Sequence, residues 1–193
     1  MKICLTFILM LIIILFEIPA CNNYQYLPII VVNHDDVTYS TKYKDNIKET
    51  CCEVKHVDVK LLTKIKHHLK LIKLLAKKYE LDPYLVIGLI YIESKFNHHV
   101  TSKTGSYGLM QFNIITRKEL NVTKKTSIYR HLDVGVKYLK YLLNMFNDEM
   151  LALGAYNVGP TGIIVNVIDQ DIVCYVNQIL NYRVYFRMIF EKR

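Results

Sequence analysis

The sequence is poor in the residues that loose or fibrous chains need. Only 7 of its 193 residues are glycine and 4 are proline, which excludes a collagen-like or linker-rich protein. Hydrophobic residues make up 52% of the chain, which excludes a disordered protein, because such a composition can bury a core. The length is that of one domain. We therefore expect a single globular domain.

Long hydrophobic runs are also missing. The nearly continuous apolar run at residues 3–16 is shorter than the ~20 residues that a membrane-spanning helix requires. With Lys2 in front of it, the run is typical of a signal peptide. We predict that residues 1–20 are a signal peptide and that the protein is exported. An uncleaved membrane anchor is the alternative, although Glu17 interrupts the run and no second apolar span follows.

The residues after the run allow two kinds of processing. Signal cleavage could occur after Ala20, or Cys21 could become the lipidated first residue of a bacterial lipoprotein, although Pro19 is unusual in a lipoprotein box. Both start the mature chain at Cys21. Both place the protein in the bacterial periplasm or cell envelope, and lipidation would attach it to a membrane.

Cysteines are too few for a disulfide framework. Of the five, Cys4 leaves with the leader and Cys21 is the lipidation candidate. The adjacent pair Cys51 and Cys52 remains, together with the distant Cys174. One bridge between that pair and Cys174 is compatible with export, and the sequence does not choose it.

Metal-binding and nucleic-acid-binding patterns are absent. The histidine doublets at residues 67–68 and 98–99 lack the i, i+4 partners that put two metal ligands on one helical face. We predict no metal and no cofactor. The formal net charge is +8, yet no aromatic interleaving or reader motif accompanies the lysines, so we predict no nucleic-acid partner. A solvated face, or one that rests on an anionic polymer outside the cell, fits better.

The mature chain changes character at residue 57. Residues 21–56 mix Asn, Asp, Tyr and Lys around a β-prone run at residues 29–32, and we interpret them as an amino-terminal arm or tether. Residues 57–193 form the expected catalytic domain, and from Val57 onward apolar side chains first recur every three or four positions, which predicts a helix. One helix starts near Val57, and others cover residues 128–146 and 151–156. The expected fold is all-α, with at most a small β element.

One predicted helix ends in a candidate catalytic acid. Asp82 can cap this helix, and Pro83 fits its first position. Residues 84–92 are apolar nearly all round, so the helix should be central. Glu93 stands at its end, where poor solvation would raise the carboxyl pKa and let it hold a proton near neutral pH. A general acid needs such a proton, although position alone also allows Glu93 to point at water.

Three ordered motifs carry a family resemblance. They are Glu93-Ser94, then Gly-Leu-Met-Gln at residues 108–111, then Ala-Tyr-Asn-Val-Gly-Pro at residues 155–160. In order and approximate spacing they resemble the soluble lytic transglycosylase (SLT) domain, which has a lysozyme-like fold. Further positions agree with the same pattern: Phe96, Asn97, Ser102, Gly105, residues 135–139, Tyr175-Val176 and Tyr182. The resemblance covers about residues 69–190.

The resemblance implies an enzyme that cleaves peptidoglycan glycan strands. The family breaks the β-1,4 bond between N-acetylmuramic acid and N-acetylglucosamine without water and leaves a 1,6-anhydromuramic end. It implies Glu93 as the catalytic residue. It also implies that Ser94 orients the glutamate or the sugar and that Gln111 bonds the substrate. Tyr156, Asn157 and Tyr175 would line the cleft.

Some of these residues have simpler interpretations. Ser94 could cap a turn, Gln111 could satisfy backbone groups, and Tyr175 could belong to the core. The chain also departs from the family where Asn113 replaces its usual Met and Ile114 its usual Pro. That methionine normally shapes a sugar subsite, so the departure bears on glycan preference.

A single carboxyl is the economical mechanism. Common glycosidases need two carboxylates, and no second one has a setting like that of Glu93. The acidic residues considered are Glu80, Asp82, Glu119, Asp133, Asp148 and Glu149. We expect a monomeric lytic transglycosylase. The alternatives are a lysozyme-type muramidase, which would deliver water, and a non-catalytic glycan-binding wall protein.

Overall fold

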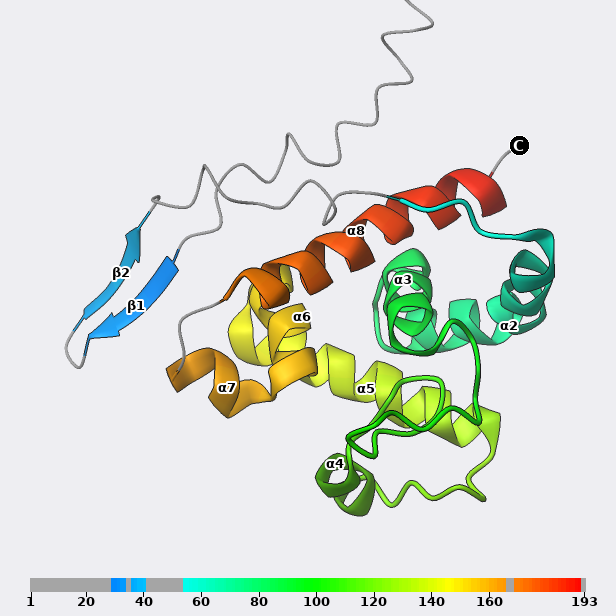
Figure 1. The fold of residues 1–193 in the computed structure, drawn as a ribbon, viewed down its shortest axis with the longest axis horizontal. Coiled ribbons are helices and arrows are strands. Elements are labelled where there is room, and N and C mark those ends of the chain that lie inside the picture. The colour runs from blue at the N-terminus through cyan, green and yellow to red at the C-terminus, as the bar shows by residue number, and fades with distance from the viewer. Residues whose placement is uncertain (1–28, 34–35, 41–53, 166–168, 192–193) are drawn as a thin grey trace, which may run out of the picture.

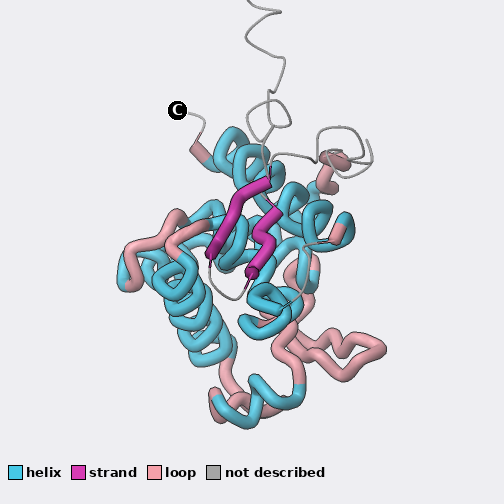
Figure 2. The backbone as a smooth tube through the Cα atoms, turned by 90° about the vertical axis from the view of Figure 1, so that its left-hand side faces the viewer, coloured by secondary structure: helices cyan, strands magenta, loops and turns pink. Residues whose placement is uncertain are grey.

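The computed structural model describes residues 29–33, 36–40, 54–165 and 169–191. Seven helices and one two-stranded antiparallel hairpin occur in this part of the chain (Figures 1 and 2). The hairpin is formed by β1 (Ile29–Asn33) and β2 (Asp36–Ser40), with Ile29 opposite Ser40. The expected all-α fold with a small β element is therefore confirmed. The predictions for the signal peptide and for Cys21, Cys51 and Cys52 lie outside the described residues.

The helices follow one another with short connections. They are α2 (Val59–Lys78), α3 (Pro83–Ser94), α4 (Ile114–Glu119), α5 (Ile128–Phe146), α6 (Glu149–Val158), α7 (Pro160–Val165) and α8 (Gln170–Phe190). The predicted helices that start near Val57 and after Asp82 correspond to α2 and α3, and residues 128–146 form α5. The prediction for residues 151–156 falls inside α6. Helices α4, α7 and α8 were not predicted from the sequence.

Helix α3 is the centre of the molecule. Every residue from Tyr84 to Tyr91 is buried. The helix packs against α8, which lies across it, and against α2 (Figure 1). Full burial of one Leu or Ile side chain contributes roughly 1.5–3 kcal/mol, so this apolar helix is a major source of stability.

Gly88 allows α3 and α8 to approach closely. A Cβ atom at this position would lie 2.6 Å from the backbone oxygen of Ile179 and 3.1 Å from the backbone nitrogen of Arg183. Arg183 also binds the side chain of Asp82, which caps the start of α3, and that of Glu149 on α6. Backbone contact and ion pairs together fix α3 against α8, and thereby the place where α3 ends.

None of the helices in the described part of the chain has the length and apolar character needed to cross a membrane. In the same residues no cluster of three or more His, Cys, Asp or Glu side chains could hold a metal ion. Cys174 on α8 is disulfide-bonded.

Candidate active site

Glu93 lies on the last turn of α3 and is half-buried. Burial raises the pKa of its carboxyl from 4.5 to about 7, and a hydrogen bond from the Tyr175 hydroxyl to Oε1 partly opposes this rise. Poor solvation penalises the ionised form, whereas a donated hydrogen bond favours it. The carboxyl therefore holds a proton near neutral pH and can also release it.

Two tyrosines from other helices accompany Glu93. Tyr175 comes from α8 and Tyr156 from α6. Burial, and secondly the negative charge of Glu93, raise the pKa of each phenol well above its ordinary value. Both hydroxyls consequently remain protonated donors, and three of the predicted site residues meet where α3, α6 and α8 converge.

The turn at residues 108–111 is fixed to the same region. The Tyr156 hydroxyl donates to the backbone oxygen of Met110 over 2.9 Å. The Gln111 amide nitrogen donates to the Gly108 oxygen at 2.8 Å and to the Val100 oxygen at 3.2 Å. Gln111 thus braces its own turn, as its simpler interpretation expected. Its side-chain oxygen accepts no hydrogen bond within the described part of the chain and can be offered to a ligand.

A buried histidine supports this turn from α5. His131 Nε2 accepts from the backbone N–H of Met110 at 3.4 Å, and its ring stacks on Phe112 with centroids 5.1 Å apart. Burial, with the nearby charges of His98 and Arg117, lowers the His131 pKa to about 4. Sequence reasoning missed this residue, because one histidine on an amphipathic helix carries no signal of what packs against it.

Two other predicted site residues are less closely involved with Glu93. The buried Ser94 hydroxyl donates to the backbone oxygen of Ile90, one turn earlier, at 3.2 Å. Asn157 is exposed on the last turn of α6, and no contact within the described residues joins it to Glu93.

The acidic residues considered as a second catalytic carboxylate are engaged elsewhere or exposed. Asp82 pairs with Arg183 and Arg187, Glu149 with Arg183, Asp133 with Lys78 and Tyr79, and Glu80 with Lys140, while Asp148 caps α6 and Glu119 is exposed on α4. Burial raises the Glu93 pKa and the Tyr175 hydrogen bond lowers it, and neither influence comes from a second carboxylate. The described site therefore has one carboxyl suited to acid–base chemistry.

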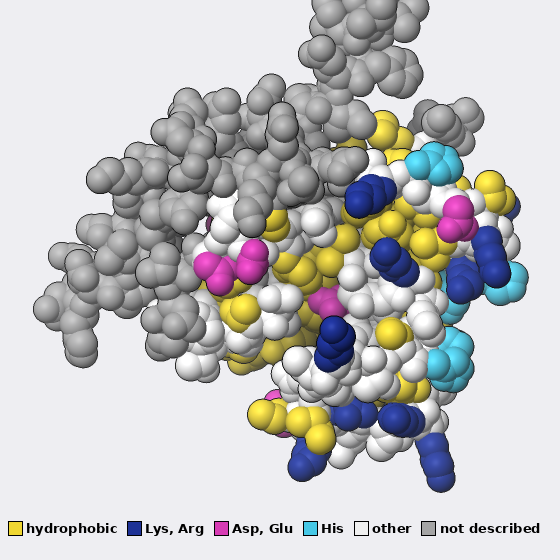
Figure 3. Space-filling model, viewed as in Figure 1, with side chains coloured by type: hydrophobic (Ala, Val, Ile, Leu, Met, Phe, Trp, Pro, Cys, Tyr) yellow, Lys and Arg dark blue, Asp and Glu magenta, His cyan; other side chains and the backbone are white. Residues whose placement is uncertain are grey.

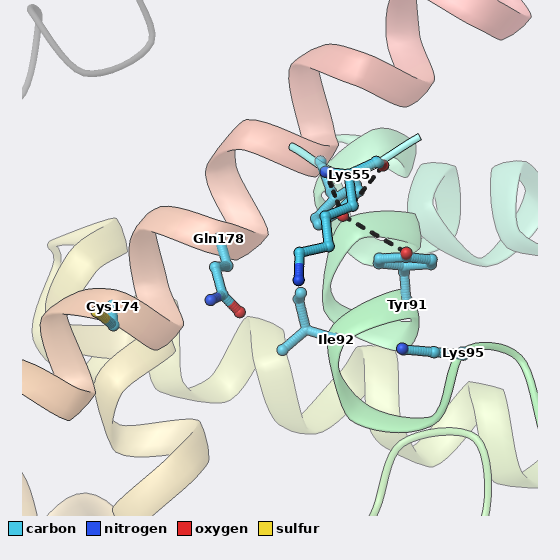
Figure 4. Close-up of a pocket in the computed structure, with 7 residues that line it drawn as sticks. Lys55, Tyr91, Ile92, Lys95, Cys174 and Gln178 are labelled. Carbon is cyan, nitrogen blue, oxygen red and sulfur yellow. Dashed lines mark hydrogen bonds between the residues drawn. The ribbon is translucent and has the colours of Figure 1, made fainter. Parts of the chain in front are cut away.

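A pocket of about 380 Å³ opens at the junction of α3 and α8 (Figure 4). Its walls come from the end of α3, from one face of α8 and from Lys55, which precedes α2. Ile92 and Cys174 line it, and they immediately precede Glu93 and Tyr175 in the sequence. The pocket therefore shares helices α3 and α8 with the site.

Comparison with known proteins identifies the family of this arrangement. The family model described as the transglycosylase SLT domain matches residues 70–170, which is more than half of the chain and includes the three motifs. The chain belongs to the transglycosylase SLT domain family. The resemblance read from the sequence is confirmed.

Two curated proteins illustrate how similar this chain is to known transglycosylases. The "Membrane-bound lytic murein transglycosylase F" of Desulfosudis oleivorans is 31% identical over 114 residues, which cover 55% of this chain and 25% of that protein. The "Transglycosylase" of Enterobacteria phage PRD1 is 38% identical over 84 residues, covering 44% and 32%. This chain thus spans only about a quarter to a third of these relatives.

Solved SLT structures show the same fold. The 70 kDa soluble lytic transglycosylase of Escherichia coli matches with a TM-score of 0.54 and 23% identity, over 64% of this chain and 24% of that one. An inactive mutant of the lytic transglycosylase Slt from Pseudomonas aeruginosa matches with a TM-score of 0.53 and 22% identity, covering 65% and 24%. The predicted lysozyme-like SLT fold is confirmed.

Proposed function

We propose that this chain is a lytic transglycosylase that cleaves the β-1,4 bond between N-acetylmuramic acid and N-acetylglucosamine in peptidoglycan. The products would carry 1,6-anhydromuramic ends, because no water enters the reaction. The observation that carries the proposal is the half-buried Glu93 carboxyl, whose pKa of about 7 suits both loss and recovery of a proton. The SLT family of residues 70–170 supports the same reaction.

Glu93 acts in two steps. Its proton passes to the glycosidic oxygen as the bond from that oxygen to C1 of the muramic sugar breaks, and the acetamido oxygen of the same sugar stabilises the positive charge at C1. The Glu93 carboxylate then takes the proton of the sugar's C6 hydroxyl, whose oxygen attacks C1 and closes the anhydro ring. One residue serves as acid and then as base, so no second carboxylate is required.

Tyr175 has a defined part in this cycle. Its hydroxyl donates to Glu93 and stabilises the carboxylate that exists between the two proton transfers. The other site residues bind the substrate: Tyr156 and Asn157 line the cleft, Gln111 offers its side-chain oxygen to an amide or hydroxyl of the glycan, and Ser94 orients the end of α3.

The proposed setting is the bacterial periplasm or cell envelope. The disulfide at Cys174 fits an oxidising compartment, and one relative bears a "membrane-bound" name. Lys and Arg side chains are spread over the described part of the face in Figure 3. A net charge of +8 favours encounter with peptidoglycan, whose stems carry carboxylates. Membrane attachment through a lipidated Cys21 and action as a monomer belong to the same proposal.

Product mass tests the reaction class. Purified peptidoglycan sacculi are digested with the protein, and the soluble muropeptides are weighed by mass spectrometry. The proposal expects anhydromuropeptides. Products heavier by one water would instead show a lysozyme-type hydrolase, and the absence of soluble products would show a glycan-binding protein without turnover. Either result contradicts the proposal.

A further inference from the structure

The pocket at the junction of α3 and α8 is lined by two lysines. Figure 4 shows the side chains of Lys55, Lys95 and Gln178 converging on the space around Ile92. Among the residues that the structure describes, none that lines the pocket is acidic and neither lysine forms an ion pair. The pocket therefore presents two ammonium groups and one amide to whatever enters it.

Lys55 is held in place by the helix opposite. The hydroxyl of Tyr182 accepts from the Lys55 backbone N–H at 3.1 Å and donates to the Lys55 backbone oxygen at 3.3 Å. Two residues on, the Val57 N–H donates to the Tyr185 hydroxyl at 3.3 Å. The segment before α2 is thus fastened to α8, and it directs Lys55 toward the pocket.

The α3 and α8 walls of the pocket are also held by defined contacts. Lys95 is the C-terminal cap of α3, with φ of 48° and its N–H bonded to the Tyr91 oxygen. On α8 the lining residues Cys174, Gln178 and Tyr182 are four apart, so they share one helical face. Tyr182 also packs on Tyr91, with ring centroids 4.2 Å apart.

Much of this pocket lies outside the SLT region. The family model covers residues 70–170, whereas Lys55, Gln178 and Tyr182 fall beyond its limits. The pocket therefore combines residues inside the matched range, on α3, with residues outside it.

We propose that this pocket binds a carboxylate of a peptide stem carried by the glycan strand that is cleaved. Lys55 and Lys95 pair with the carboxylate, Gln178 bonds the peptide amides, and Ile92 with Tyr91 contacts the apolar part of the stem. Hydrogen bonds between ammonium and carboxylate are among the stronger ones in proteins. This inference rests on the proposed function, since it takes peptidoglycan as the substrate.

A pair of substrates tests the pocket. The double variant Lys55→Gln/Lys95→Gln is assayed on intact peptidoglycan and on glycan strands from which an amidase has removed the peptides and whose freed lactyl carboxyls have been amidated. We expect KM on intact peptidoglycan to rise about tenfold and KM on stripped strands to stay unchanged. The matched control Lys60→Gln/Lys64→Gln removes two exposed charges from α2 and should leave both values near those of the wild type.

Binding without turnover separates the pocket from the catalytic proposal. In a Glu93→Gln background, calorimetry compares a disaccharide-peptide with the same compound whose stem carboxylates are amidated. We expect amidation to weaken binding about tenfold, and this loss to disappear once Lys55 and Lys95 are replaced. Equal KM changes on both substrates, no change on either, or indifference to amidation would overturn the pocket proposal. If the wild type cleaves neither substrate, the proposed function fails and the binding measurement decides the pocket alone.

Discussion

At the scale of single residues, the site depends on opposing influences on one carboxyl. Burial at the end of α3 raises the pKa of Glu93, and the Tyr175 hydroxyl limits the rise, so the pKa comes to about 7. With burial alone the acid would release its proton reluctantly. With a fully solvated setting the proton would be lost before substrate arrived. The balance gives a group that is useful in both directions.

This balance has a cost in stability that depends on pH. Folded Glu93 keeps its proton up to about pH 7, whereas the unfolded chain loses it near the ordinary pKa of 4.5. The wild type therefore loses free energy of unfolding as the pH rises between these values. Glu93→Gln removes that loss. Relative to wild type it should gain about 3 kcal/mol between about pH 4 and about pH 8.

Urea unfolding at the two pH values checks this gain. The control Glu119→Gln changes an exposed carboxyl on α4 and should show no comparable dependence on pH. A Glu93→Gln difference that is the same at both pH values would mean that Glu93 is well solvated in the folded protein.

The phenol of Tyr175 should set the alkaline limit of activity. Tyr175→Phe removes the hydrogen bond that lowers the Glu93 pKa, so this pKa should move above 7. The alkaline limb of the kcat/KM profile should then shift to higher pH, because kcat/KM reports the free enzyme's acid. The rate below that limb should fall about tenfold, since the carboxylate intermediate loses a donor.

A pH–rate profile on peptidoglycan measures both effects. Tyr141→Phe, which alters an exposed tyrosine on α5, should leave the limb where it is. A limb that stays fixed or moves to lower pH in Tyr175→Phe would show that the hydroxyl does not act on Glu93.

At the scale of elements, local sequence rules predicted the helices that begin with strong signals. Asp82 and Pro83 mark the start of α3, and the spacing of apolar residues gave α5 its observed limits. The structure of the segment between α3 and α5 was harder to predict from the sequence. Its turn at residues 108–111 is held by contacts with α5 and α6, and such contacts leave no periodic pattern. Helix α4 has six residues, none of them buried, and is too short to show an apolar face.

Among the contacts between elements, the junction of α3 and α8 is the one most sensitive to substitution. An exposed helical Gly→Ala change usually stabilises by about 1 kcal/mol. At Gly88 the new Cβ would meet the Ile179 oxygen at 2.6 Å, so the two helices must separate. Gly88→Ala should therefore destabilise the protein by about 2 kcal/mol. It should also lower activity, because Glu93 and Tyr175 come from these two helices.

Thermal or urea unfolding, with turnover on peptidoglycan, measures the effect. Leu74→Ala truncates an exposed side chain on α2 and should stay within about 0.5 kcal/mol of wild type. A Gly88→Ala variant that gains stability would contradict the close approach of α3 and α8.

At the scale of the whole molecule, the sequence named candidate residues but did not show how they meet. Sequence motifs named Glu93, Tyr156 and Tyr175 as candidate site residues, and the structure brings these three side chains together. The bond between Tyr175 and Glu93 joins residues 82 positions apart, and no local spacing records it. The same holds for Lys55, whose place in the pocket depends on two hydrogen bonds to Tyr182 on the last helix.

The central claim is that one carboxyl performs the whole reaction, and a single assay tests it most directly. Wild type and Glu93→Gln are incubated with purified sacculi, and released anhydromuropeptides are quantified by mass spectrometry. Circular dichroism confirms that the variant is folded. We predict release by the wild type and a loss of at least about a thousandfold in the variant, because a carboxamide cannot donate a proton to the glycosidic oxygen. Continued anhydromuropeptide release by folded Glu93→Gln protein would contradict the account.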